Sequence, residues 1–390
     1  MRRSIITKKL SQVIFSSLKT SKPTQQPIIA ILADPLDNQQ AGVHVFTREL
    51  IRALVDQGKG DQLLLIREKR DPSLDVKQIV VPNIHLPIGF ASFRLFFIIP
   101  FLLRNRGVAA VFEPAHFGPF NLPHRIKRIT MIHDLTPLLF PQYHRWHSQL
   151  LQKIFLKRIL RKTDWVFTNS RHTSKDVVRF FPFTEKKTQH LYLGNNAAFK
   201  PTKNIDRINE LGITKPYFIY VGTIEPRKNL ELLLSSFKTF CSNNNQEVEL
   251  VIAGQMGWKS AGFQQSLAEH PYRNKIKLLG FVAFSDLPIL YTHATALIYP
   301  SRYEGFGLPI IEALACGTDV ITAKNSSLKE IGEGAAFFFK TDDAASLVRR
   351  MEEIFCSNED RSLKNQQHGQ KFSWEQCAAN FWQKVLEVVK

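Results

Sequence analysis

Residues 299–317 read YPSRYEGFGLPIIEALACG. The pattern predicts a buried strand that ends at Tyr299 and Pro300, a glycine-containing loop, and a helix that begins near Leu308. Pro309 suits the first turn of that helix, where proline's missing amide hydrogen costs nothing. Glycines let a ligand approach the loop backbone, and the amide groups at the start of the helix favour an anion such as a diphosphate. The segment therefore predicts an anion-binding strand–loop–helix unit.

Two carboxylates belong to this unit. Glu304 lies in the loop, and Glu312 lies on the second turn of the predicted helix. Ionised carboxylates accept hydrogen bonds from hydroxyl groups, such as those of a sugar or a ribose. A strand–loop–helix unit alone is common and a lone glutamate is usually solvated, so the functional interpretation needs support from other loops.

A second loop supplies cations. In YVGTIEPRKNL at 220–230, Arg227 and Lys228 follow a predicted strand and precede a predicted helix. A guanidinium and an ammonium at that place could hold two phosphates. Both could instead be solvated, but cations at a helix N-terminus oppose the helix dipole unless an anion lies there. A third loop, AGQMGW at 253–258, contributes Gly254, so three loops are expected to converge on one crevice.

Short buried strands alternate with helices through the chain, which is typical of parallel, doubly wound sheets. The expected strands lie at 28–33, 62–68, 108–114, 128–134, 165–170, 217–223, 248–254, 276–281, 294–300 and 318–324. A polar segment with two prolines, 195–215, is the best linker candidate. We therefore predict an α/β protein of two doubly wound, Rossmann-like domains that face each other across a cleft.

The expected organisation has four parts. They are a basic N-terminal arm at 1–26, an N-terminal domain at 27–200, a C-terminal domain at 201–370, and a C-terminal helix at 371–390 that is a candidate to pack back on the N-terminal domain.

The composition is that of an ordinary globular protein of about two domains. The 390 residues are 44% hydrophobic and 22% charged, and 19 glycines and 20 prolines are unremarkable counts, which excludes collagen-like and disordered chains. The cysteines are scattered without CxxC spacing, so we expect a reducing compartment, no disulfide framework and no structural zinc. They are Cys241, Cys316, Cys356 and Cys377.

The net charge of +18 comes entirely from the first half of the chain. Residues 1–200 contain 31 Lys and Arg against 13 Asp and Glu, whereas residues 201–390 contain 21 of each. A basic half indicates a polyanionic partner, either a nucleic acid or an anionic membrane. No nucleic-acid-binding motif is recognisable, so we expect an anionic membrane surface and no nucleic acid.

Three segments are candidates for that membrane contact. Leu95–Leu103 (LFFIIPFLL) is too short to span a bilayer and predicts either a core helix or strand pair, or an interfacial helix. Residues 149–164 predict a basic helix, for which an ordinary solvated face is an equal alternative. The arm at 1–26 has six basic residues, no acidic residue and no cleavage site of a secretory signal.

The second half resembles the donor domain of the GT-B, family-4 retaining glycosyltransferases (glycosyl transferases group 1). Glu304 and Glu312 match that family's two glutamates separated by seven residues. Five segments follow the family's order: VGTIEPRKNL, LVIAGQMGWKS, LLGFVAFSDLPILY, YPSRYEGFGLPIIEALACG and SSLKEIG. GTIEPRKN and MIHDLTP are most similar to bacterial surface-polysaccharide mannosyltransferases.

The resemblance implies a role for each matching position. Glu312 would bind the ribose of a nucleotide, Arg227 and Lys228 its diphosphate, and Glu304 the donor sugar. The expected catalytic residues are His133 and Glu304, and the expected donor-binding residues are Gly42, Arg227, Lys228, Gly254, Gly305, Phe306, Gly307, Leu308 and Glu312. The chain departs from the family at Thr223, where many relatives have Arg, and in a glycine loop that keeps only Gly42, beside His44.

The resemblance also implies a reaction. We expect retaining transfer of a hexose, with mannose from GDP-mannose favoured, to a glycan or polyprenyl-diphosphate-linked acceptor in surface-polysaccharide synthesis. We expect no cofactor and no metal, and a cytoplasmic location, peripheral at the inner face of the plasma membrane. The alternatives are a GT-B nucleotide-sugar epimerase or hydrolase, a basic membrane- or nucleic-acid-binding module, and an inactive sugar-binding relative, which the presence of both glutamates disfavours.

Overall fold

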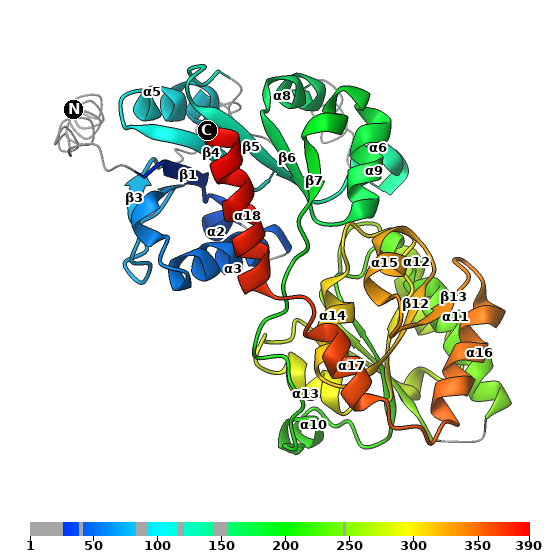
Figure 1. Ribbon diagram of the computed structural model, residues 1–390. Coiled ribbons are helices and arrows are strands. Elements are labelled where there is room, and N and C mark those ends of the chain that lie inside the picture. The colour runs from blue at the N-terminus through cyan, green and yellow to red at the C-terminus, as the bar shows by residue number, and fades with distance from the viewer. Residues whose placement is uncertain (1–25, 39–41, 83–92, 116–120, 144–154, 245–246) are drawn as a thin grey trace, which may run out of the picture.

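The computed structural model describes residues 26–38, 42–82, 93–115, 121–143, 155–244 and 247–390. Residues 1–25 of the predicted arm and residues 149–154 of the predicted basic helix lie outside this part of the chain. The described chain forms two domains, each with one parallel sheet and helices packed on it (Figure 1). This architecture confirms the predicted pair of doubly wound domains.

The N-terminal sheet has seven parallel strands in the order β3-β2-β1-β4-β5-β6-β7. The strands are β1 (Ile28–Leu32), β2 (Leu63–Arg67), β3 (Lys77–Val80), β4 (Val108–Glu113), β5 (Lys127–Ile132), β6 (Trp165–Thr168) and β7 (Thr188–His190). The helices of this domain are α2 (Pro35–Asn38), α3 (Gly42–Asp56), α5 (Ile99–Leu103), α6 (Thr136–Leu139), α8 (Lys157–Lys162) and α9 (Arg171–Phe180).

The C-terminal sheet has six parallel strands in the order β10-β9-β8-β11-β12-β13. The strands are β8 (Tyr217–Val221), β9 (Glu249–Ala253), β10 (Ile276–Gly280), β11 (Ala296–Tyr299), β12 (Asp319–Ala323) and β13 (Phe337–Phe339). The remaining helices are α10 (Asp206–Glu210), α11 (Leu230–Asn243), α12 (Ala261–Ala268), α13 (Leu287–Thr292), α14 (Leu308–Ala315), α15 (Ser326–Gly332), α16 (Ala344–Phe355), α17 (Ser362–Gly369) and α18 (Trp374–Val389).

All ten predicted strands form, and three further strands were missed. The missed strands β3, β7 and β13 each lie at the edge of a sheet. An edge strand pairs on one side only and is often short, so β3 and β7 do not need the apolar run that marks a central strand. β7, for example, reads only TQH. β13 is apolar (FFF) but has only three residues.

The last helix returns to the N-terminal domain. After α17 packs against α14, α18 crosses to α3 on the other domain. In Figure 1, α18 lies over the N-terminal sheet. The Phe381 ring lies 4.7 Å from that of Phe112 on β4, and Gln57 donates a hydrogen bond to the Glu375 carbonyl at 2.8 Å. The two domains are therefore tied together by the C-terminal helix as well as by the chain that follows β7.

The apolar run at Leu95–Leu103 is helical. A π-helical segment, η2 (Arg94–Ile98), continues into α5, and the pair covers one face of the N-terminal sheet through Ile99 and Leu103. The expected strand pair is thus excluded. Within the described part of the chain, no helix has both the length and the apolar character to cross a membrane.

Candidate active site

The loops at the carboxyl ends of the two sheets meet between the domains. Gly305, after β11, lies against the end of β5, so that a Cβ atom built on it would lie 1.9 Å from the His133 carbonyl oxygen. Thr173 on α9 donates a hydrogen bond to the Gly305 carbonyl at 3.2 Å. Figure 1 places α9 opposite α15 at this junction. The loops that carry His133 and Gly305 are therefore brought to one place.

Glu304 is the centre of a buried ion cluster in this loop. Its Oε1 atom lies 2.6 Å from Lys228 Nζ, and its Oε2 atom lies 2.8 Å from Arg227 Nη1. Both cations come from the 3₁₀ turn η6 (Pro226–Lys228) that precedes α11. Burial alone would raise the pKa of Glu304, but Arg227 and Lys228 outweigh it and hold the pKa at about 2. Glu304 is therefore ionised throughout the neutral range.

The two adjacent cations have different surroundings. Arg227 also binds Glu225 Oε1 at 2.6 Å and donates to the Tyr303 carbonyl at 2.7 Å. Burial opposes the charge on Arg227, but the carboxylates of Glu304 and Glu225 raise its pKa above the usual value. Burial lowers the pKa of Lys228, although Glu304 partly offsets this.

The protein itself supplies the anion that these cations require near the start of α11. The argument from the helix dipole therefore no longer points to a bound phosphate. Lys228 Nζ forms its ion pair with Glu304 and donates a hydrogen bond to the hydroxyl of Tyr299 at 2.8 Å, whereas Arg227 forms ion pairs with both Glu304 and Glu225. Lys228 is thus the less neutralised of the two cations.

Glu312 occupies a different environment on α14. The hydroxyl of Tyr291 donates a hydrogen bond to its Oε2 atom at 3.1 Å. Burial raises the pKa of Glu312 to about 7, although the bond from Tyr291 acts in the opposite direction. Glu312 can therefore gain or lose a proton near neutral pH, and hydroxyl donors from a ligand would favour its ionised form.

The loop backbone before α14 is held by the start of α15. Gly307 has φ of 108°, a left-handed conformation that suits glycine, and it precedes the first residue of the helix, Leu308. Ser327 donates hydrogen bonds to the carbonyls of Glu304 and Phe306, both at 2.8 Å. The SSLKEIG segment thus fixes the shape of the loop.

The two remaining glycines differ in their surroundings. A Cβ atom built on Gly254 would lie 1.9 Å from the Gly222 carbonyl oxygen, so Gly254 permits close packing of two neighbouring loops. Gly42 is the first residue of α3, and a Cβ atom there would meet nothing within 4 Å. Open space therefore lies at Gly42, whereas Gly254 is explained by packing.

His133 follows β5 and is neutral. Its Nε2 atom lies 2.8 Å from the Pro114 carbonyl oxygen, which can only accept, so Nε2 carries the hydrogen and Nδ1 is left as an acceptor. Burial lowers the pKa of His133, although the bond to Pro114 acts in the opposite direction. The ring also packs edge-on against Phe46 at 5.1 Å. At neutral pH, His133 can accept a hydrogen bond from a ligand but carries no charge.

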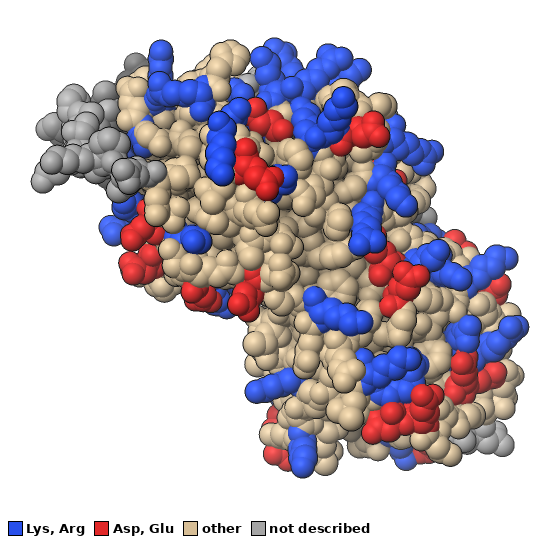
Figure 2. Space-filling model, in the orientation of Figure 1, with Lys and Arg blue, Asp and Glu red and all other residues tan. Residues whose placement is uncertain are grey.

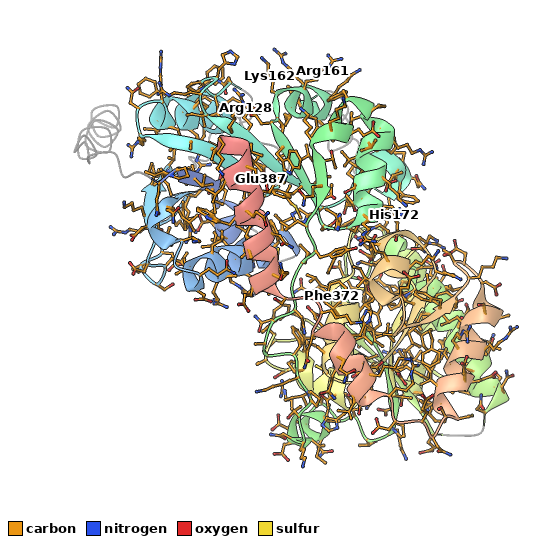
Figure 3. The ribbon with its side chains drawn as sticks, in the orientation of Figure 1. Arg128, Arg161, Lys162, His172, Phe372 and Glu387 are labelled. Atoms are coloured by element: carbon orange, nitrogen blue, oxygen red, sulfur yellow. The ribbon has the colours of Figure 1, made fainter. Side chains whose placement is uncertain are left out.

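Sequence reasoning missed a set of contacts that join the domains. Glu330 on α15 accepts hydrogen bonds from the backbone N–H groups of Arg171 at 2.9 Å and His172 at 3.0 Å, and from the Tyr192 hydroxyl at 2.6 Å. Figure 3 shows His172 at this junction. Glu330 belongs to SSLKEIG, which the sequence marks, but nothing in the sequence indicates that its partner is the start of α9.

A second missed contact lies beside Glu304. The Tyr303 hydroxyl donates a hydrogen bond to Asp176 Oδ2 on α9 at 2.5 Å. A further contact between the domains is made by Lys259, which donates to the Gln142 carbonyl at 2.5 Å. Among the described residues, no group of three or more His, Cys, Asp and Glu side chains could hold a metal ion.

Two Rossmann-like domains that meet at their carboxyl edges, with Glu304 and the η6 cations on one side and His133 on the other, define a GT-B glycosyltransferase. The chain belongs to the glycosyl transferases of group 1 and family 4. Residues 201–370 match "Glycosyl transferases group 1", and residues 41–198 match "Glycosyltransferase Family 4".

Similar proteins include mannosyltransferases. The chain is 28% identical over 271 residues to the O-antigen chain mannosyltransferase B of Escherichia coli, covering 67% of this chain and 71% of the relative. It is 30% identical over 267 residues to the serotype-specific mannosyltransferase WbdA of Escherichia coli, covering 64% of this chain but only 32% of that relative.

Solved structures share the fold at low identity. Sucrose-phosphate synthase from Thermosynechococcus elongatus has a TM-score of 0.72 at 19% identity, over 93% of this chain and 99% of that chain. Anabaena Alr3699/HepE in complex with UDP-glucose has a TM-score of 0.71 at 16% identity, over 93% and 100% of the two chains. These likenesses confirm the GT-B fold.

Proposed function

We propose that the protein is a retaining hexosyltransferase that moves mannose from GDP-mannose to a glycan or polyprenyl-diphosphate-linked acceptor in surface-polysaccharide synthesis. The ion cluster of Glu304, Arg227 and Lys228 at the domain junction is the observation that carries the proposal. Two relatives that are O-antigen chain mannosyltransferases, from Escherichia coli and Salmonella typhimurium, support the proposal. Another, from Campylobacter jejuni, is 25% identical and by its name acts on a diphospho-undecaprenol-linked sugar.

The reaction breaks the bond between the anomeric carbon and the diphosphate oxygen, and it forms a bond from that carbon to the acceptor oxygen. The acceptor's proton passes to the departing diphosphate. Because Glu304 has a pKa of about 2 and ion pairs on both oxygens, it is too weak a base to take that proton at neutral pH. Attack from the side of the leaving diphosphate, which would retain the anomeric configuration, fits this limit.

Each candidate residue then has a chemical task. Lys228 and the amide groups at the start of α14 stabilise the negative charge that develops on the diphosphate. Glu304 accepts hydrogen bonds from sugar hydroxyls, and neutral His133 accepts one through Nδ1 from the other domain. Glu312, with a pKa of about 7, accepts hydrogen bonds from ribose hydroxyls once it is ionised.

Location is part of the proposal. We place the enzyme in the cytoplasm, bound peripherally to the inner face of the plasma membrane. The excess of Lys and Arg in residues 1–200 supports attraction to anionic lipid head groups. A lipid-linked acceptor would be presented at that surface.

A nucleotide-release screen tests the proposal. Purified protein is incubated with GDP-, UDP- or ADP-sugars and a polyprenyl-diphosphate-linked glycan, and GDP-mannose should give the highest turnover. Glu304→Ala should reduce turnover by roughly 10³ and Lys228→Ala should also lower it strongly, whereas Glu333→Ala, at an exposed position of the same domain, should leave it unchanged. Full turnover in the first two variants would contradict the site, and release of free sugar or an epimer without acceptor would instead support a hydrolase or epimerase.

A further inference from the structure

A row of exposed phenylalanines lies on the helix that covers the N-terminal sheet. Phe93, Phe97 and Phe101 are 51%, 61% and 69% exposed, and their spacing of four places them on one face of the η2–α5 helix. The rings of Phe93 and Phe97 stack at 5.2 Å. Such a row is unusual on a surface that faces only water.

The opposite face of this helix fixes its orientation. Arg94 is buried, and its guanidinium binds both carboxylate oxygens of Asp34, at 2.5 and 2.8 Å, and the Val81 carbonyl at 2.6 Å. Ile99 and Leu103 pack into the core of the domain. Arg94 is therefore a structural anchor that fixes the helix to the sheet. The phenylalanines are held outward by this anchoring.

The basic helix α8 lies on the same face of the sheet. On the central strands, Val111 of β4 pairs with Ala30 of β1 on one side and with Arg128 of β5 on the other. Thr130 lies two residues after Arg128 on β5, so it points to the same face, and it pairs with Val166 of β6. Side chains paired across parallel strands point to the same face, so all five share one face. The core on this face contains Ile99 and Leu103 near Val111 and, at the other end, Leu156 and Leu160 near Val166. Figure 1 shows α5 and α8 along the same side of the domain.

Cations dominate this side of the molecule. Apart from the buried, ion-paired Arg94, the described segments 93–115, 121–132 and 155–164 contain nine Arg and Lys against two acidic residues, the buried Glu113 and Asp164, which pairs with Lys127 at 3.9 Å. Figure 2 shows Lys and Arg gathered along the side of the N-terminal domain that lies away from the C-terminal domain. Figure 3 shows Arg161 and Lys162 on α8 there.

We propose that this basic aromatic face, formed by the η2–α5 helix, residues 121–128 and α8, docks on an anionic lipid bilayer. Phe97 and Phe101 enter the boundary between head groups and acyl chains, while the cations of α8 contact phosphate groups. The inference deepens the membrane association proposed above and rests on it. It names the surface, and through it the orientation of the enzyme.

The charge of this face favours an anionic bilayer as its partner over a second copy of the chain or a nucleic acid. In a symmetric dimer the face would meet its own copy, and the cations would face like charges. An anionic bilayer offers negative head groups to the cations and an apolar layer to the phenylalanines, so it complements both components of the face. A nucleic acid would complement the cations alone.

The orientation suits a lipid-linked acceptor. Arg94 binds Asp34, which follows the carboxyl end of β1, so the Phe93 end of the helix lies at the edge of the sheet where the active-site loops gather. The Phe101 end leads toward Val108 at the amino end of β4. The Phe93 end of this face is therefore the end nearer to the domain junction.

Vesicle sedimentation of the full chain tests the proposal without donor or acceptor. Vesicles of phosphatidylcholine with phosphatidylglycerol should bind the wild-type protein, and salt should weaken the binding. The double variant Phe97→Ser/Phe101→Ser should lower the partition coefficient at least about tenfold. Its matched control is Leu363→Ser, at a side chain 72% exposed on α17 of the other domain, which should bind as the wild type does.

A charge variant separates the two components. Arg161→Gln/Lys162→Gln should lower binding to the anionic vesicles about tenfold or more but change binding to pure phosphatidylcholine little. Lys364→Gln/Lys371→Gln, exposed in the charge-balanced half, is its control. Wild-type binding by the phenylalanine variant would overturn the proposal. So would a wild-type dimer that this variant converts to monomers, or retention of duplex DNA without vesicle binding.

The outcome of the vesicle-binding experiment can be distinguished from the outcome of the test of transferase activity. Turnover of a nucleotide sugar with a water-soluble glycan should be the same in the phenylalanine variant and in the wild type, because the face lies outside the ion cluster. If the wild-type protein fails to bind any vesicle, the membrane association falls, but the transferase activity is still judged by the nucleotide-release screen.

Discussion

Glu304 and Glu312 are eight residues apart, and the protein holds them in opposite electrostatic states. Glu304 is flanked by two cations, which keep its pKa at about 2. Glu312 has a tyrosine hydroxyl as its partner, and burial raises its pKa to about 7. The difference arises because η6 delivers its cations to the loop and not to the helix. Identical side chains in one motif are thereby fitted to different tasks.

Glu304 in the loop is therefore always ionised near neutral pH, whereas Glu312 on the helix changes its protonation state there. A carboxylate that stays ionised can hold both the cations and a sugar at every physiological pH. A carboxylate that titrates near 7 makes ligand binding sensitive to pH. Variants at and around the two positions can break or sharpen this contrast.

The largest effect is expected for Glu304→Ala. The variant leaves Arg227 and Lys228 buried without their shared partner, which should cost about 3–5 kcal/mol of unfolding free energy and reduce turnover by roughly 10³. Denaturant unfolding at several pH values measures the first quantity. Because the pKa of Glu304 is depressed, its stabilisation is present above about pH 4.5 and is lost as the pH falls toward about 2.

Glu333→Ala is the control for this prediction, since Glu333 is an exposed carboxylate of the same domain. An equal loss of stability in both variants would mean that the ion cluster has no special weight. A stable Glu304→Ala variant would show that the two cations are solvated, contrary to the buried cluster.

The next largest effect is expected for Gly305→Ala. The new Cβ atom would lie 1.9 Å from the His133 carbonyl, a backbone atom that cannot turn aside. We expect the loop to move away from β5, and turnover to fall about 10²-fold because the groups of the two domains lose their alignment. Steady-state kinetics with the nucleotide sugar measures this.

Gly60→Ala is a matched control, because the nearest atom to its added Cβ would lie at an ordinary 3.5 Å. Donor affinity should change less than turnover in Gly305→Ala, since the donor-binding cluster lies within one domain. A loss confined to donor affinity would contradict a role for this loop in joining the domains.

A smaller and pH-dependent effect is expected for Glu312→Gln. If ribose binding needs the ionised carboxylate, a pKa of about 7 predicts that nucleotide affinity falls about tenfold from pH 8 to pH 6. Calorimetric titration with the free nucleotide across this range should show the fall in the wild type and not in Glu312→Gln.

The pH dependence of unfolding is a second measurement of the protonation of Glu312. Because the pKa of Glu312 is raised, its contribution to stability is complete below about pH 4.5 and is lost as the pH rises through about 7. The Gln variant should lack this loss. If the unfolding free energy of the wild type and of the Gln variant depended on pH in the same way, Glu312 would not have a raised pKa and would not differ from Glu304 in this respect.

The fold was predictable because apolar, β-branched runs such as IIAIL and ELVIA leave little choice but central parallel strands. The two glutamates and the two cations were predictable as neighbours because loops at the carboxyl ends of parallel strands converge. The sequence could not predict that Glu304 would bind both cations, because that depends on distances between two loops more than 70 residues apart.

Two further features depend on tertiary packing alone. Arg94 looks like a surface charge in the sequence, but its partner Asp34 lies 60 residues away on another strand end. The sequence leaves Leu95–Leu103 as either a core element or an interfacial helix, and the exposure of Phe97 and Phe101 becomes known only when the buried side of the helix is known. Periodicity reveals a helix face but does not reveal which face meets the sheet.

The smallest effect is expected at a third carboxylate, Glu330, whose partners are neither cations nor a single hydroxyl. Its oxygens accept from the first N–H groups of α9 and from Tyr192, so it stabilises the approach of the two domains through the positive end of a helix. Glu330→Gln keeps one acceptor oxygen and turns an amide group toward the remaining donors. We expect turnover to fall about threefold to tenfold, which corresponds to roughly 1 kcal/mol.

Hydrogen exchange distinguishes this role from a general loss of stability. The backbone amides of Arg171 and His172 should exchange faster in Glu330→Gln. Nucleotide affinity should not change, because it depends on the loops of the C-terminal domain. Glu333→Gln, on the turn after α15, should leave both quantities unaltered. Unchanged hydrogen exchange at α9 together with reduced turnover would mean that Glu330 acts on the Glu304 loop through α15, which holds that loop by Ser327. Glu330 would then support Glu304 and would not be a third carboxylate with a separate task.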